Sequence, residues 1–278
     1  MWRFFAARQR AGQLTVALAL WQALQAAVRR EPIGTTGRPA RASEGSTRYS
    51  GVMRRGAIIV CGGRSNRMGR DKATLPFGGE VLLQRIVGIL RPMIAPTNMV
   101  VVAAVGQALP PLEPGIRIVV DRRPHQGPLE AISVGLAALG PGVDAAFVTG
   151  CDFPLLTAPF VLRLFELLGN AEIAAPYDGI LRHCLTAVYR PTVLPAVERL
   201  LSANRLKVQE LLDICVCRDV GLEELREVDP QLQSLLNINT PEQYAAALAA
   251  ANAGSGSPVG GGAEAGGGPS QSPDKGRL

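Results

Sequence analysis

The sequence predicts an α/β sandwich, in which a mostly parallel sheet lies between layers of helices. Short apolar runs alternate with segments whose apolar residues recur at helical spacing, and this alternation continues over residues 56–250. Hydrophobic residues make up 47% of the 278 residues, which is enough for a sizeable core. Charged residues make up only 19%, which excludes a disordered polyelectrolyte.

The expected strands are continuous apolar runs, because parallel strands are covered by helices on both faces. These runs are 57–61, 99–105, 116–120, 145–149 and 185–189. Apolar residues three and four apart predict helices over 81–89, 129–139 and 161–168. A last helix is expected after Thr240, a capping residue that is followed by Pro241 at the first helical position.

Charge is distributed unevenly along the chain. Residues 1–55 hold ten arginines and two glutamates, whereas residues 56–250 hold 17 basic and 19 acidic residues. The net charge of +6 therefore comes from the N-terminal segment, and the body of the chain is not expected to bind nucleic acid. We interpret residues 1–55 as an extension outside the fold, with Met53 as an alternative start. The Gly/Ser/Pro-rich residues 251–278 are expected to form a disordered tail.

Cysteine content and the N-terminal apolar run predict the compartment. Five cysteines without a C-x-x-C pair, together with two histidines, exclude a disulfide-dense scaffold and a zinc finger. The apolar run 14–28 is short for a membrane span and lacks a good signal-peptide cleavage site. We therefore expect a cytoplasmic protein without a membrane partner; attachment through residues 1–30 is the alternative.

The first candidate site is the loop that follows the strand 57–61. Its glycine pair, Gly62-Gly63, lets backbone N–H groups approach a ligand, and successive N–H groups form an anion nest. Ser65, Arg67 and Lys72 follow, so the loop favours a polyphosphate ligand. The spacing matches neither a P-loop nor G-x-G-x-x-G. The alternative is an ordinary strand–loop connection with a solvated basic patch.

The second candidate site consists of aspartates just beyond predicted strands. Asp152 follows the strand 145–149, at the edge where open α/β sheets bind ligands. A carboxylate there suits Mg²⁺, which takes one or two protein carboxylates together with phosphate oxygens. Asp121 similarly ends the strand 116–120. The alternative role for Asp152 is a turn aspartate near the start of the following helix.

Together these segments resemble the molybdenum cofactor guanylyltransferases, of the MobA-like nucleotidyltransferase family. The resemblance covers about residues 56–250 and rests on motifs that follow the family's order. They are Val60-Cys61-Gly62-Gly63, Ser65, Arg67-Met68-Gly69, Asp71-Lys72, Leu75-Pro76-Phe77-Gly78-Gly79, Asp121, Gly127-Pro128-Leu129, Cys151-Asp152-Phe153-Pro154 and Asn237-Ile238-Asn239-Thr240-Pro241-Glu242. It implies a three-layer α/β/α sandwich with a Rossmann-like, mostly parallel sheet, as in nucleotide-diphospho-sugar transferases.

The resemblance also implies a reaction: transfer of GMP from GTP to the phosphate of molybdenum-loaded molybdopterin, with release of pyrophosphate. It implies partners that load molybdopterin or chaperone molybdoenzymes. The cofactor implied is Mg²⁺, held by Asp152. The implied catalytic residues are Arg67, Lys72 and Asp152. The implied nucleotide-binding residues are Val60, Cys61, Gly62, Gly63, Ser65, Lys72, Asp121 and Asp152, and the implied acceptor-binding residues are Asn237 and Asn239.

The sequence departs from the family pattern in three places. Relatives often carry an asparagine at the end of the second strand, where this chain has Ala103-Ala104-Val105. Glu130-Ala131 replaces an expected glycine, and Arg182-His183-Cys184 stands near a usual proline-leucine. The glycine pair favours GTP, since cytidylyl relatives usually show alanine-glycine there. A cytidylyl or sugar-phosphate nucleotidyltransferase and a non-catalytic nucleotide-binding module are the alternatives.

Overall fold

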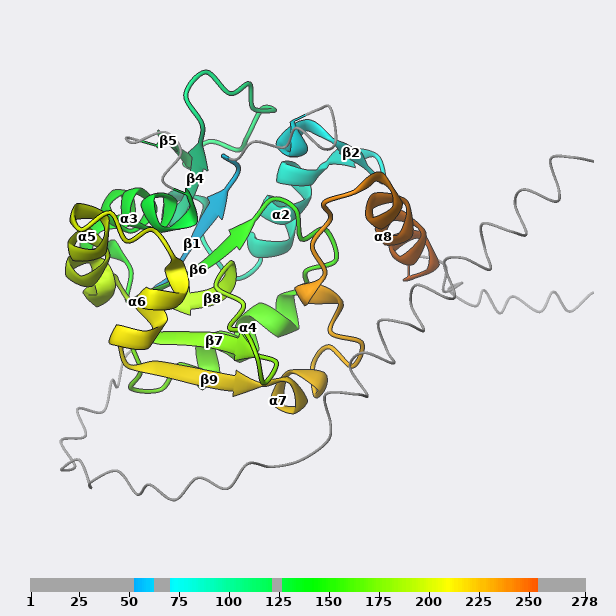
Figure 1. Ribbon diagram of the computed structural model, residues 1–278. Helices are drawn as coiled ribbons and strands as arrows, with labels where there is room; N and C mark the ends of the chain where they lie inside the picture. The colour runs from blue at the N-terminus through cyan, green and yellow to red at the C-terminus, as the bar shows by residue number, and fades with distance from the viewer. Residues whose placement is uncertain (1–52, 63–70, 122–126, 255–278) are drawn as a thin grey trace, which may run out of the picture.

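The computed structural model describes residues 53–62, 71–121 and 127–254 and has the three-layer architecture expected (Figure 1). Within these residues one seven-stranded sheet has the order β5-β4-β1-β6-β8-β7-β9. Its strands are β1 (Arg55–Val60), β4 (Met99–Ala103), β5 (Arg117–Val120), β6 (Ala145–Gly150), β7 (Ile173–Tyr177), β8 (Thr186–Tyr189) and β9 (Cys217–Gly221). The α-helices are α2 (Leu82–Leu90), α3 (Gly127–Leu139), α4 (Ala158–Leu167), α5 (Leu194–Ser202), α6 (Val208–Ile214), α7 (Leu222–Arg226) and α8 (Pro241–Gly254).

Shorter elements complete the described chain. The strands β2 (Pro76–Phe77) and β3 (Glu80–Val81) form a separate hairpin. The 3-10 helices are η1 (Lys72–Thr74), η2 (Pro96–Asn98), η3 (Gly140–Gly142), η4 (Pro191–Val193) and η5 (Gln233–Leu235).

The sheet is mostly parallel, as the sequence predicts. β1 pairs in parallel with β4 and β6, β4 with β5, and β7 with β9. β8 alone among these strands runs antiparallel, to both β6 and β7. The carboxyl ends of β1, β4, β6 and β7 therefore meet at one edge of the sheet, where the loops after them can share a ligand.

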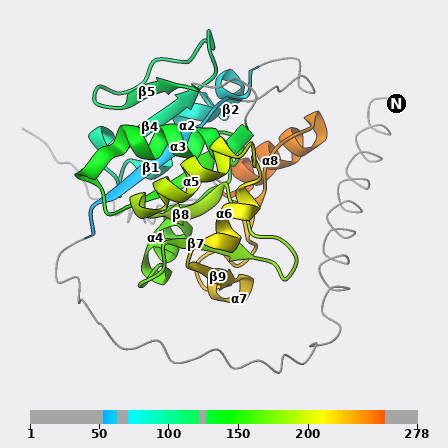
Figure 2. The ribbon, with the colours of Figure 1, turned by 60° about the vertical axis from the view of Figure 1, so that its left-hand side comes forward.

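Helices cover the two faces of the sheet and bury separate cores. α2, α4 and α7 pack on one face, and α3, α5 and α6 pack on the other (Figure 2). β1 supplies both cores from alternate residues: Ala57 and Ile59 face the first layer, and Ile58 faces the second. This two-sided burial explains why β1 and β4 read as unbroken apolar runs.

The last helix joins the body through a third, smaller cluster. Ala247 of α8 is buried with Phe77 of the hairpin and Ile238 of the preceding segment. The Tyr244 ring meets the Phe77 ring edge to face at 6.2 Å, and its hydroxyl donates to the Pro76 carbonyl. In Figure 1, α8 accordingly lies beside β2, away from the layers on the sheet.

Several element boundaries differ from those expected. β1 begins at Arg55 and ends at Val60, and β4 ends at Ala103. The expectation of a buried strand over 116–120 is wrong: β5 lies at the edge of the sheet, and Ile118 is 53% exposed. Nothing described beyond β5 covers it, so its apolar sequence reflects strand propensity rather than burial.

The sequence prediction did not include the strands β2, β3, β7 and β9 or the helices α5, α6 and α7. Expectations for residues 1–52 and 255–278 lie outside the described residues and stay predictions. At the boundaries, Met53 packs partly against the first core, and α8 continues beyond residue 250 to Gly254. No helix in the described ranges is both long and apolar enough to cross a bilayer.

Helix α3 approaches β1 closely at a glycine, which gives a test of the packing. A Cβ added to Gly135 would lie 2.5 Å from Ile58 Cγ2, in a fully buried position. We expect Gly135→Ala to lower the free energy of unfolding by about 1–3 kcal/mol through overpacking, measured by urea denaturation. The control is Gly88→Ala in α2, where a Cβ meets nothing within 4 Å, which should raise stability by about 0.5–1 kcal/mol. Equal effects of the two changes would contradict the packing described.

Candidate active site

The site lies where β1, β4 and β6 end side by side. The N–H groups of Cys61 and Gly62 both donate to the Val102 carbonyl of β4, at 2.9 and 3.3 Å. On the other side, the Cys151 N–H donates to the Val60 carbonyl at 3.2 Å. These bonds carry the parallel register past the strand ends and fix the start of both predicted ligand-binding loops.

A lysine occupies the centre of the site. The Lys72 ammonium donates to Asp152 Oδ2 at 2.9 Å and to Asn239 Oδ1 at 2.8 Å. The Lys72 and Asp152 side chains are 16% and 19% exposed, so their ion pair is largely shielded from water. The three residues come from η1, the loop after β6 and the segment before α8. The resemblance implies phosphate, metal and acceptor binding for them, in that order, and these roles stay predictions. The fold brings them into one cluster.

Lys72 is positioned by the turn in which it lies. Asp71 caps η1, and its Oδ1 accepts a hydrogen bond from the Ala73 N–H at 2.9 Å. The Leu75 N–H closes the same turn by donating to the Lys72 carbonyl at 3.1 Å. A short 3-10 turn with a side-chain cap therefore fixes the backbone from which the ammonium extends.

Asp152 is held by contacts on both sides of the loop after β6. A Cβ at Gly150 would lie 2.3 Å from Asp152 Oδ1, so the aspartate side chain occupies space that only glycine leaves open. The Asp152 carbonyl accepts from the Ile238 N–H at 2.9 Å. Two residues on, the Pro154 carbonyl accepts from Arg85 Nε at 2.5 Å. Asp152 is thus a fixed carboxylate rather than a freely rotating surface group.

The segment before α8 forms a capping box that orients Asn239. The Gln243 N–H donates to Thr240 Oγ1 at 3.3 Å, and Gln243 Oε1 accepts from the N–H groups of Asn239 and Thr240. The predicted capping role of Thr240 is confirmed. Asn237 is exposed, and its side chain has no hydrogen bond among the described residues. Only one of the two predicted acceptor-binding asparagines therefore joins the cluster.

Asp121 lies at the opposite side of the site, at the end of β5. Its N–H donates to the Ala103 carbonyl at 3.1 Å, and its Oδ2 is 3.4 Å from the position that a Cβ at Gly62 would occupy. Its Oδ1 is buried and has no hydrogen-bond partner among the residues that the structure describes. Burial raises the pKa of the Asp121 carboxyl above its ordinary value. This unsatisfied acceptor is a feature that a bound ligand donor would relieve.

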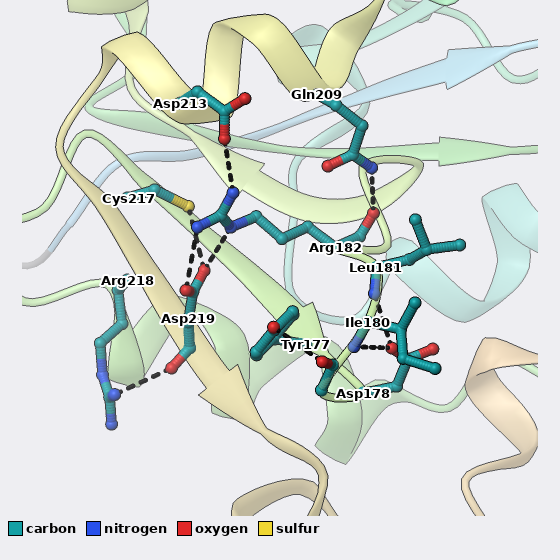
Figure 3. A network of polar contacts seen from close by, with 11 residues as sticks. Tyr177, Asp178, Ile180, Leu181, Arg182, Gln209, Asp213, Cys217, Arg218 and Asp219 are labelled. Atoms are coloured by element: carbon teal, nitrogen blue, oxygen red, sulfur yellow. Dashed lines mark hydrogen bonds and ion pairs between the residues drawn. The ribbon is translucent and has the colours of Figure 1, made fainter. Parts of the chain in front are cut away.

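The loop after β7 reaches the same edge of the sheet and is internally braced (Figure 3). Asp178 Oδ1 accepts from the N–H groups of Ile180 and Leu181, at 2.8 and 2.7 Å. Arg182 binds both oxygens of Asp219 and also reaches Asp213 Oδ1 at 2.8 Å. Hydrogen bonding to Arg182 lowers the pKa of the Asp219 carboxyl. These contacts explain the departure from the family pattern here as a structural anchor for the loop.

The structure shows where some of the predicted site residues lie, and others fall outside the described ranges. Lys72, Asp152 and Asn239 meet, Val60, Cys61 and Gly62 line the adjacent strand end, and Asp121 faces Gly62. Gly63, Ser65 and Arg67 lie outside the described residues, so their roles stay predictions. Sequence reasoning missed Gln107, which contacts both Cys61 and Asp71. The only signal was a glycine turn, Gly106, directly after the second strand.

The described residues hold no group of three or more His, Cys, Asp or Glu side chains that could bind a metal ion. A cation at Asp152 would therefore have fewer than three such protein ligands among the described residues and would depend on oxygens of the substrate as well. That donor set suits a hard divalent ion that arrives with a phosphate ligand.

Comparison with known proteins identifies similar chains. Residues 57–215 match the model of the MobA-like NTP transferase domain. A probable molybdenum cofactor guanylyltransferase of Mycobacterium avium (strain 104) is 38% identical over 206 residues, which cover 72% of this chain and 98% of that protein. The protein of the same description from Mycobacterium tuberculosis (strain ATCC 25618 / H37Rv) is 38% identical over 188 residues, which cover 66% of this chain and 88% of that protein.

Solved structures share the fold at lower sequence identity. Molybdopterin-guanine dinucleotide biosynthesis protein A of Archaeoglobus fulgidus aligns with a TM-score of 0.59 at 19% identity, covering 71% of this chain and 98% of that one. The 2-C-methyl-D-erythritol 4-phosphate cytidylyltransferase of Thermus thermophilus aligns with a TM-score of 0.54 at 16% identity, covering 70% and 98%. These likenesses confirm the fold class.

Asp121 Oδ1, which has no partner within the described ranges, predicts that this carboxylate lowers the stability of the fold while serving ligand binding. Because folding raises its pKa, the ionised group costs stability at pH 7, and this cost disappears as pH falls below the unfolded pKa near 4. We expect Asp121→Asn to raise the free energy of unfolding at pH 7 by at most about 1 kcal/mol, because water screens the partly exposed carboxyl; urea denaturation measures the change. The gain should vanish at pH 3.5.

The control is Asp144→Asn at the opposite end of the sheet. Arg54 lowers the pKa of Asp144 by hydrogen bonding, so this substitution should cost stability at pH 7. Loss of stability in both variants would mean that the Asp121 carboxylate is favourably paired.

Proposed function

The chain belongs to the MobA-like NTP transferase family, and we propose that it transfers GMP from GTP to the phosphate of molybdenum-loaded molybdopterin. The observation that carries this proposal is the cluster of Lys72, Asp152 and Asn239 at the carboxyl edge of the sheet. It joins a cation for phosphates, a carboxylate for a metal and an amide for an acceptor. The 38% identity to proteins described as molybdenum cofactor guanylyltransferases supplies the substrates.

The proposed reaction is a displacement at phosphorus. A phosphate oxygen of molybdopterin attacks the α-phosphorus of GTP, a new P–O–P bond forms, and the bond to the β-phosphate breaks with its electron pair leaving on pyrophosphate. The acceptor phosphate is already a nucleophile at neutral pH, so the protein needs no general base. Its contribution is to position the two phosphates and to neutralise charge, which is the task of Lys72 and, as proposed, of Arg67.

The strand end supports guanine as the base. The N–H groups of Cys61 and Gly62 already donate to the Val102 carbonyl, whereas each backbone carbonyl has a second lone pair to offer. The backbone at the end of β1 therefore offers hydrogen-bond acceptors, rather than donors, to a ligand. Guanine presents two adjacent donors, N1–H and the 2-amino group, whereas cytosine presents an acceptor beside a donor. We assign Val60, Cys61, Gly62, Gly63 and Ser65 to nucleotide binding, with Asp121 as a further acceptor.

Asp152 is the residue that would hold Mg²⁺. The fit rests on its donor chemistry: a fixed carboxylate beside a cluster that suits phosphates, with Lys72 balancing its charge in the absence of ligand. Bound there with the nucleotide, Mg²⁺ would neutralise phosphate charge in the transition state. The Lys72 ammonium would then donate to phosphate oxygens, and Asn239 and Asn237 are proposed to bind the acceptor.

The proposed function also implies where the protein acts and which kind of protein it works with. We propose the cytoplasm as the compartment, supported by five cysteines that are all free in the described chain. Partners that load molybdopterin or chaperone molybdoenzymes are proposed from the chemistry alone, because the product must pass to another protein to be used.

The competition between Lys72 and a metal ion for Asp152 can be tested by metal binding. Lys72→Met keeps the apolar stem and removes the ammonium, so we expect Mn²⁺, as a probe, to bind without nucleotide at least about 10-fold more tightly than to the wild type. Turnover with GTP should nevertheless fall by about 100-fold. Electron paramagnetic resonance of free Mn²⁺ measures the affinity. The control is Lys207→Met, at an exposed position before α6. Unchanged Mn²⁺ affinity in Lys72→Met would remove Asp152 as the metal ligand.

Pyrophosphate release with molybdenum-loaded molybdopterin tests the function itself. Among GTP, CTP, ATP and UTP, we expect the wild type to release pyrophosphate with GTP. Asp152→Asn keeps size but loses the charge that a hard cation needs, so the rate should fall by about 100-fold or more. The matched control, Asp144→Asn at the other end of β6, should keep the wild-type rate. Release with CTP in place of GTP would overturn the guanine assignment, and a wild-type rate in Asp152→Asn would overturn the mechanism.

A further inference from the structure

The turn after β4 carries a glutamine that reaches into the site. Residues 104–107 close a turn in which the Gln107 N–H donates to the Ala104 carbonyl at 3.1 Å. Gly106 in this turn has a φ of +72°, a conformation that favours glycine. The Gln107 side chain folds back over the end of the strand. It supplies an amide where the strand itself ends in small apolar residues.

All three polar groups of the Gln107 amide are used. Its Oε1 accepts from the Ala104 N–H at 2.8 Å. Its Nε2 donates to the Cys61 carbonyl at 3.2 Å and to Asp71 Oδ1 at 2.9 Å. The reversed amide would place its oxygen against two acceptors and its NH₂ against a donor, so the partners fix its orientation. A side chain with both donors and its acceptor satisfied is a fixed bridge rather than a loose surface contact.

This bridge joins the base end of the site to its phosphate end. Cys61 belongs to the strand end assigned to the base. Asp71 Oδ1 also accepts from the Ala73 N–H and so caps the turn that carries Lys72. The amide therefore connects two points on either side of residues 63–70. A shift of Asp71 would move η1 and with it the ammonium that contacts Asp152.

We infer that Gln107 is a positioning residue for nucleotidyl transfer, which fixes the Cys61 carbonyl relative to the turn that carries Lys72. The inference rests on the proposed function for its reaction, whereas its geometry is independent of the substrate. Gln107 acts through Asp71 and Cys61 and does not itself contact the reacting phosphates. Small displacements of such groups are costly, because a misplacement of about 1 Å can lower a rate by about 100-fold.

The requirement for an amide makes the inference testable by pH. In Gln107→Glu the new carboxyl faces the Asp71 carboxylate and the Cys61 carbonyl. When ionised it repels both, and when protonated its O–H can donate to Asp71 while its C=O accepts from Ala104. Proximity to the Asp71 carboxylate raises the pKa of the new carboxyl above the ordinary value of a glutamate, so its protonated fraction grows as pH falls. Rate and stability should therefore both recover as pH falls.

The experiment compares wild type, Gln107→Glu, Gln107→Ala and Gln84→Glu between pH 6 and pH 8.5, by GTP-dependent pyrophosphate release and by urea denaturation. Gln84 is the matched control, since its amide donates to the Pro111 carbonyl on the exposed side of α2. We expect kcat of Gln107→Glu to be at least about 10-fold below wild type at pH 8 and to recover toward pH 6. Gln107→Ala should stay low throughout, and Gln84→Glu should follow the wild type.

The outcomes separate the possible failures. A Gln107→Glu variant with the rate and pH profile of Gln84→Glu overturns the inference. A pH-dependent loss of stability without a loss of kcat in the folded variant also overturns it, since the bridge would then be structural only. A wild type that uses another nucleoside triphosphate contradicts the guanine assignment alone, and the comparison is made with that nucleotide. A wild type that neither binds nor uses any nucleoside triphosphate overturns both proposals.

Discussion

The contact of the Lys72 ammonium with Asp152 and Asn239 is the constraint on which the site depends. A cation that is only 16% exposed needs compensating groups, and here they come from segments far apart in the sequence. The loop after β6 supplies charge and the segment before α8 supplies an amide oxygen. The docking of α8 through Phe77, Tyr244 and Ala247 is therefore part of the site's construction, although this helix lies away from the sheet.

The sheet lowers the conformational entropy cost of this convergence. Val60 pairs with Val102 on one side and with Gly150 on the other, so three strands end at the same level. The loops after them start from fixed positions, and short connections suffice to bring their side chains together. Where the chain needs closer approach it uses glycine, at Gly62 beside Asp121 and at Gly150 beneath Asp152. At this edge of the sheet, the strand ends are fixed by hydrogen bonds, and the glycines just beyond them leave room for neighbouring side chains.

The sequence predicts the central strands and the site residues that follow them, because buried parallel strands leave long apolar runs and their ends leave polar motifs. It does not predict β9, whose residues Arg218 and Asp219 interrupt any apolar pattern, since an edge strand is buried on few sides. It likewise misses Gln107, because no local pattern records that a turn residue will fold back onto Cys61 and Asp71. Tertiary hydrogen bonds between distant segments have no sequence period. Propensities and motifs therefore predict where helices and strands lie along the sequence, but they do not predict the hydrogen bonds that connect distant segments.

Under the proposed assignment, the two ends of the site would recognise a nucleotide by opposite means. At the phosphate end the groups are side chains, and the ion pair of Lys72 and Asp152 must open for either to meet a ligand. Opening is favourable only if the ligand brings both signs of charge, a phosphate for the lysine and a cation for the aspartate, because an uncompensated charge in a shielded site is costly. At the base end the groups are backbone carbonyls, with the Cys61 and Gly62 N–H groups already committed to Val102. A metal–nucleotide complex whose base presents donors meets both requirements at once. Neither a free cation nor a free nucleotide would do so, and the proposed roles of these residues therefore favour binding of the complex.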